Sequence, residues 1–99
     1  LVVPRAGRYR ITFNVLATTN ASGASSFITR CAAGSRDYNG STSYTATSGY
    51  SQQSTGSVTV ALTAGQDVSL WVYKFGVAVT VKDAGGVIAA NWLTVEEVV

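Results

Sequence analysis

Residues Pro4 to Val15 read PRAGRYRITFNV, and the alternation of side chains in this stretch indicates the fold class of the chain. The apolar residues occupy every second position: Tyr9, Ile11, Phe13 and Val15. A period of two residues is that of a β-strand with one face in a core and the other in contact with solvent. We therefore predict a strand from Arg8 to Ala17, with Arg8 and Arg10 projecting from the face opposite the core.

The same alternation recurs along the rest of the chain. It predicts strands in the segments SFITRCA (26–32), SVTVAL (57–62), VSLWVYKF (68–75), VAVTV (77–81) and VIAANWLTVEEV (87–98). The segment TSYTATSGYSQQSTG (42–56) is weakly patterned, and we expect one strand and a long turn there. Val, Thr, Tyr, Phe and Trp dominate these segments, while Gly, Ser, Asn and Asp separate them, which argues against helix. Several short strands with such breaks predict an all-β fold of the β-sandwich class. We expect the inward positions to form its core: Tyr9, Phe13, Leu62, Val68 and Leu70.

The polar segments between the strands are predicted as loops. They are TTNASGAS (18–25), GSRDYNGS (34–41) and SGYSQQSTG (48–56), with tight turns at TAGQD (63–67) and KDAGG (82–86). The side chains of such loops hydrogen-bond adaptably and stack on sugars or peptides. We therefore expect any ligand-binding residues to lie there, and predict these: Tyr38, Asn39, Tyr50 and Gln52.

The composition indicates one domain, spanning 1–99, that hides surface against other chains. Only 12% of the 99 residues are charged and 46% are hydrophobic, so the chain covers itself with uncharged polar groups, with partner chains, or with both. In the segment 68–75, Trp71 and Tyr73 lie on the face opposite Leu70 and Val72, which predicts that they form an interface. The net charge of +2 is dispersed, which argues against nucleic acid, and no apolar run is long enough to span a membrane.

Arg8 and Arg10 have two alternative roles, which the sequence leaves open. They either lie in solvent with their aliphatic stems over apolar surface, or they form an interface with a carboxylate of another protomer or another protein. The chain opens on LVVP without a methionine. This beginning resembles the end of a strand, and we expect the sequence to be the C-terminal part of a longer chain.

Side chains for catalysis are scarce. The chain has no histidine and one cysteine, Cys31, which removes the usual general base and the Ser-His and Cys-His nucleophile pairs. We predict that the protein is not an enzyme and has no cofactor. Two alternatives stay open: a pair of loop carboxylates suited to glycoside hydrolysis, and a calcium site built from loop carboxylates and carbonyls.

Two motifs resemble the complement 1q and tumour-necrosis-factor-like family. Its Pro-x-x-Gly-x-Tyr-x-(aromatic or apolar)-x-Phe strand is matched by Pro4, Gly7, Tyr9 and Phe13. Its later strand pair is matched by Val60, Leu62, Gly65, Gln66, Val68 and Leu70. The resemblance implies a jelly-roll β-sandwich, here without its first strands, that assembles as a homotrimer. The family's closing Phe-x-Gly-Phe-x-Leu strand is replaced by NWLTVEEV.

This resemblance, with the abundance of small residues, implies a structural or receptor-binding domain at the surface of a bacteriophage virion, at a tail or fibre tip or as a capsid decoration. Its partners would be other virion proteins or a glycan or protein of the host surface. The alternative is a secreted, extracellular lectin-like recognition module of a bacterial or animal complement 1q-like protein.

Overall fold

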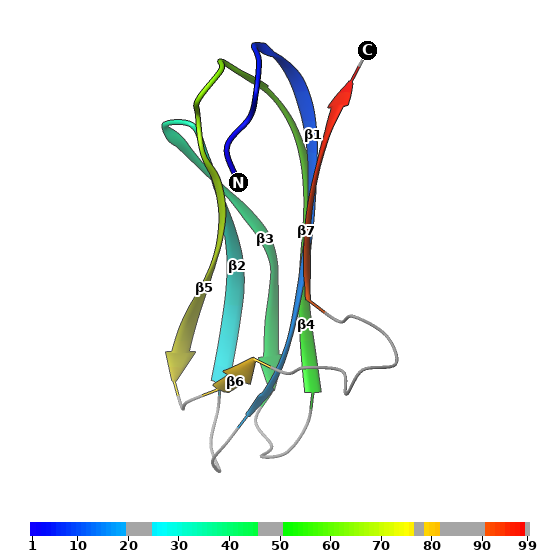
Figure 1. Cartoon of the computed structure of the whole chain (residues 1–99). Helices are drawn as coiled ribbons and strands as arrows, with labels where there is room; N and C mark the ends of the chain where they lie inside the picture. The colour runs from blue at the N-terminus through cyan, green and yellow to red at the C-terminus, as the bar shows by residue number, and fades with distance from the viewer. Residues whose placement is uncertain (20–24, 46–50, 77–78, 82–90, 99) are drawn as a thin grey trace.

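The computed structural model of the chain describes residues 1–19, 25–45, 51–76, 79–81 and 91–98. These residues form seven strands and no helix: β1 (Gly7–Thr19), β2 (Ser25–Ala33), β3 (Arg36–Thr45), β4 (Ser51–Leu62), β5 (Val68–Gly76), β6 (Val79–Val81) and β7 (Trp92–Val98) (Figure 1). No helix long and apolar enough to cross a membrane occurs in this part of the chain.

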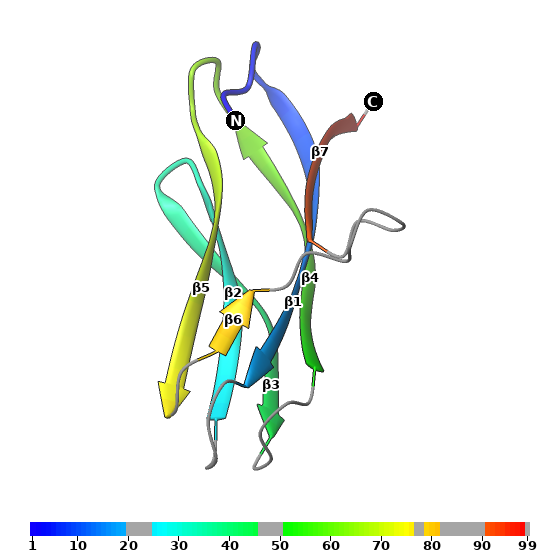
Figure 2. The same ribbon diagram turned by 60° about the horizontal axis from the view of Figure 1, so that its bottom comes forward.

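The strands form two antiparallel sheets that face each other (Figures 1 and 2). In the first sheet, β1 pairs with β4 along one edge and with β7 and β6 along the other. In the second sheet the order is β3-β2-β5. The predicted all-β, sandwich-like class is confirmed, while the finer jelly-roll assignment stays a prediction.

The two faces of β1 point as the alternation of its side chains predicts. Tyr9, Ile11 and Phe13 are buried between the sheets, whereas Arg8 and Arg10 are exposed. The expected core is also largely confirmed, since Leu62 and Val68 are buried and Leu70 packs half-buried against the same cluster. From the second sheet, β2 contributes Phe27, Thr29 and Cys31, each fully buried. Burial of alternate residues from both facing sheets is what joins the two layers.

A polar contact crosses between the sheets at a bulge. Between Ile28 and Arg30 the register of β2 against β3 shifts, because Arg30 lies opposite Asn39 and Ile28 opposite Thr42. The fully buried Ser54 of β4 contacts Thr29, the residue at this bulge. The Ser54 hydroxyl accepts a hydrogen bond from the Thr29 backbone N–H at 3.0 Å and lies 2.8 Å from the Thr29 hydroxyl.

Two of the predicted loops are wrong in large part. The turn after β2 is confined to Gly34 and Ser35, and the rest of the segment 34–41 belongs to β3, while 51–56 belongs to β4. One glycine in each segment, Gly40 or Gly56, lies where the two sheets approach closely. A Cβ added at Gly56 would lie 2.3 Å from Phe13 Cζ, and one at Gly40 would lie 2.3 Å from Thr29 Oγ1. Glycine inside a strand often marks such an approach and does not always indicate a loop.

The turn predicted at 63–67 is confirmed. Gly65 has a φ of 88°, which a residue with a Cβ adopts only with strain. The backbone of Val3 pairs with this turn, since its N–H donates to the carbonyl of Gln66 at 3.0 Å and its carbonyl accepts from Gly65 at 2.9 Å. The predicted turn at 82–86, residues 20–24 of the first loop and the start of the last predicted strand lie outside the described residues.

Candidate functional site

The site is the outer surface of the β3-β2-β5 sheet. Trp71, Tyr73 and Phe75 of β5 project there, since they have the strand phase opposite to Leu70 and Val72, which pack against the core. Their exposed fractions are 56%, 42% and 60%. The predicted exposure of Trp71 and Tyr73 on the face opposite the core is therefore confirmed, whereas their interface role stays a prediction.

Strand register places two polar side chains beside these rings. Arg30 of β2 lies opposite Trp71 on one side and opposite Asn39 of β3 on the other. Its Nε donates a hydrogen bond to Asn39 Oδ1 at 3.0 Å, and its guanidinium carbon lies 4.3 Å from the centroid of the Tyr73 ring. Stacking on an aromatic face and a side-chain hydrogen bond together hold the cation in one orientation. We call these five residues, Trp71, Tyr73, Phe75, Arg30 and Asn39, the aromatic face.

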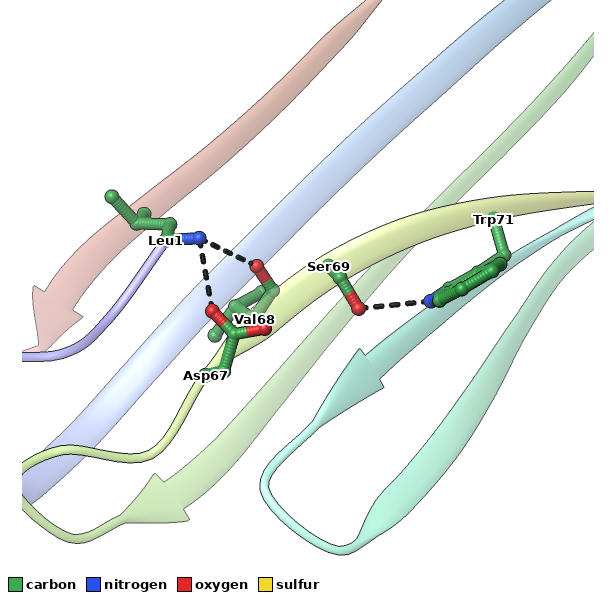
Figure 3. A network of polar contacts seen from close by, with 5 residues as sticks. All are labelled: Leu1, Asp67, Val68, Ser69 and Trp71. Carbon is green, nitrogen blue, oxygen red and sulfur yellow. Dashed lines mark hydrogen bonds and ion pairs between the residues drawn. The ribbon is translucent and has the colours of Figure 1, made fainter.

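The polar atom of Trp71 is satisfied within its own strand. Its Nε1 donates to the hydroxyl of Ser69 at 2.9 Å (Figure 3). Near the same end of β5, the Leu1 amino group lies 3.1 Å from Asp67 Oδ1 and donates to the carbonyl of Val68 at 3.0 Å. Because its single donor is already used, the indole of Trp71 offers a partner its ring surface.

The structure separates the four residues predicted to bind a ligand. Asn39 belongs to the aromatic face, but on β3 and not on a loop. Tyr38, its neighbour, points the other way and packs half-buried against the core, because successive residues of a strand face opposite sides. Gln52 lies in β4 opposite Ala17, with its side chain outside the description. Tyr50 lies outside the described residues.

Two of the three arginines in the segment 5–10, Arg5 and Arg10, form ion pairs within the chain. Arg10 Nε lies 2.8 Å from Glu96 Oε1, and Arg5 Nε donates to Glu97 Oε2 at 2.9 Å. The hydrogen bond that Arg5 donates to Glu97, together with the charge of that carboxylate, raises the pKa of Arg5. The antiparallel pairing of β1 with β7 produces the Arg10 contact, since Arg10 is directly opposite Glu96. An intramolecular partner for Arg10 is a third arrangement, distinct from the two that the sequence suggested. Arg8 is exposed, without an ion pair to any described carboxylate.

Groups that could hold a metal ion or perform catalysis are dispersed. In the described ranges, no three His, Cys, Asp or Glu side chains come together as metal ligands. Three of the four described carboxylates, those of Asp67, Glu96 and Glu97, form ion pairs. Asp83 lies outside the described ranges. Burial, with a smaller contribution from the charge of Asp37, raises the pKa of the Cys31 thiol, which disfavours the reactive thiolate.

Two members of the aromatic face, Arg30 and Phe75, were missed as site residues. The alternation of VSLWVYKF already places Phe75 on the surface of Trp71, and that of SFITRCA places Arg30 on an outward position. Only the pairing of β2 with β5 shows that Arg30 shares the surface with Trp71. Comparison of the chain with protein-family models, curated proteins and solved structures gives no match. The resemblance to the complement 1q and tumour-necrosis-factor-like family therefore stays a prediction.

Proposed function

We propose that the domain is a non-enzymatic recognition module, acting as a trimeric structural or receptor-binding domain of a bacteriophage virion. The aromatic face is the observation that carries the proposal. Three large aromatic side chains at alternate positions of one strand are exposed together on one surface, whereas Trp92, the other exposed aromatic residue among those described, belongs to the opposite sheet. Contiguous apolar surface with polar groups at its side is typical of interaction sites. Because the side chains stand on a strand of a sheet, binding orders little backbone.

The trimeric, virion-associated form of the proposal draws on two further features. The chain passes from one sheet to the other after β1, β3, β4 and β5, which supports a jelly-roll arrangement of the kind found in viral proteins. The motifs of Pro4–Phe13 and Val60–Leu70 support the same family. The alternative function, a secreted lectin-like module, uses the same face, and the genes adjacent to the coding sequence distinguish the two.

Recognition is tested with the fluorescently labelled protein on a panel of bacterial and animal cells, by flow cytometry. We expect binding to some of these cells, and we expect the double substitution Trp71→Ala, Phe75→Ala to abolish it. Trp92→Ala is the matched control, because Trp92 is also an exposed tryptophan but belongs to β7 of the other sheet. Binding to no cell, or equal loss in the control, contradicts the proposal. Light scattering tests the trimer separately, and a monomer at micromolar concentration refutes it.

A further inference from the structure

Arg30 carries a positive charge and forms no ion pair with a described carboxylate. The ion pairs of the described residues join Leu1 with Asp67, Arg5 with Glu97 and Arg10 with Glu96, and none includes Arg30. Arg30 is nonetheless held in place by Asn39 and by the Tyr73 ring. Since Nε is the atom that bonds Asn39, the two Nη groups remain as a fork of donors. Such a fork matches the two oxygens of a carboxylate.

The aromatic rings beside Arg30 form a narrow strip. Trp71 and Phe75 are separated by four residues of extended strand, about 13 Å. From the exposed fractions of 56%, 42% and 60%, the three rings present roughly 300 Å² of apolar surface, taking a whole aromatic side chain as about 150 to 250 Å². A stable protein interface buries about 800 Å² on each partner. The strip is therefore small for a protein contact and suits a narrow, elongated ligand.

We propose that the aromatic face binds an acidic glycan, a chain of sugar rings that carries carboxylates. The C–H faces of the sugar rings would stack on the negative π surfaces of Trp71 and Phe75. The indole N–H of Trp71 is already bonded to Ser69, and Phe75 has no polar atom. A carboxylate of the glycan would pair with the Nη groups of Arg30. Such a glycan would contact both the apolar rings of the face and the guanidinium of Arg30. This inference rests on the proposed function of the same face as a recognition surface.

Calorimetric titration with two acidic probes, an oligomannuronate hexamer and a hyaluronan hexasaccharide, tests the proposal, with cellohexaose as the neutral comparison. We expect at least one acidic probe to bind more tightly than cellohexaose. Trp71→Ala should weaken that binding roughly tenfold, as loss of one stacked ring does. Arg30→Gln should remove the preference for the acidic probe, and Arg30→Lys should restore it only in part, because lysine lacks the planar fork.

Two control variants isolate the face. Trp92→Ala and Arg8→Gln remove an exposed tryptophan and an exposed arginine from the other sheet, and we expect neither to change the affinity. The proposal is overturned if neither acidic probe binds, if cellohexaose binds equally well, or if the control variants weaken binding as much as Trp71→Ala does. Cell binding that depends on Trp71 and Phe75, with no binding of the acidic probes, overturns the glycan proposal and leaves the recognition function standing. If the protein binds neither the cells nor the acidic probes, both proposals are refuted.

Discussion

Replacing Ser54 with alanine tests whether the polar contact at the bulge holds the two sheets together. The Ser54 hydroxyl accepts a hydrogen bond from the Thr29 N–H at 3.0 Å, contacts the Thr29 hydroxyl at 2.8 Å and donates to the carbonyl of Ser41. Ser54 and Thr29 are both fully buried. In the variant, the N–H and the hydroxyl of Thr29 lose their partner in a region closed to water.

The expected cost follows from those two groups. A buried polar group left without a hydrogen bond costs about 1 to 3 kcal/mol, so Ser54→Ala should lower the free energy of unfolding by about 3 kcal/mol. For a domain of this size the melting temperature should fall by roughly 10 to 20 °C. Urea unfolding followed by tryptophan fluorescence measures the free energy, and calorimetry measures the melting temperature.

Two further variants test whether the contact of Ser54 with Thr29 causes the loss. Ser57→Ala, on the same strand but exposed, should change the stability by less than about 0.5 kcal/mol. In the double variant with Thr29→Val, the loss should be smaller than the sum of the two single losses by about 1 kcal/mol, since the two hydroxyls interact with each other. A loss for Ser54→Ala that matches that of Ser57→Ala would refute the assignment of a cross-sheet contact.

Three other predictions concern packing, the thiol and a surface ion pair. Gly56→Val should destabilise the fold by about 2 kcal/mol or more because its Cβ would meet the Phe13 ring, and an unchanged urea midpoint would contradict this. The Cys31 thiol should react with Ellman's reagent only after unfolding. Because the folded protein keeps the thiol proton that the unfolded chain releases, the free energy of unfolding should fall as the pH rises above about 8.5, and Cys31→Ala should remove that part of the pH dependence. Arg10→Ala should lower the free energy of unfolding in urea by less than about 1 kcal/mol, since its ion pair with Glu96 is exposed. A larger loss would contradict this assignment of a weak surface ion pair.

The candidate site was predicted in part. The alternation in the segment 68–75 was sufficient to place Trp71 and Tyr73 on an outward face. It was not sufficient to show what lies beside them, because Arg30 is some forty residues away in the sequence and is brought to Trp71 by strand pairing. Asn39 was chosen for its residue type on a supposed loop, and the structure places it on a strand of the same face. Tyr38, chosen for the same reason, is half-buried, since it has the opposite strand phase.

By itself, the sequence determined the all-β class, the phase of β1, β4 and β5, and most of the core. These features follow from the two-residue period of extended backbone, which is a local property and can be read from neighbouring residues. Only the tertiary structure decided which strands pair, that Gly40 and Gly56 lie inside strands at a close approach of the sheets, and that Arg10 meets Glu96 while Arg30 meets no described carboxylate. Pairing and register depend on contacts between residues distant in sequence, and a strand with weak alternation leaves its register unspecified until its partners pack against it.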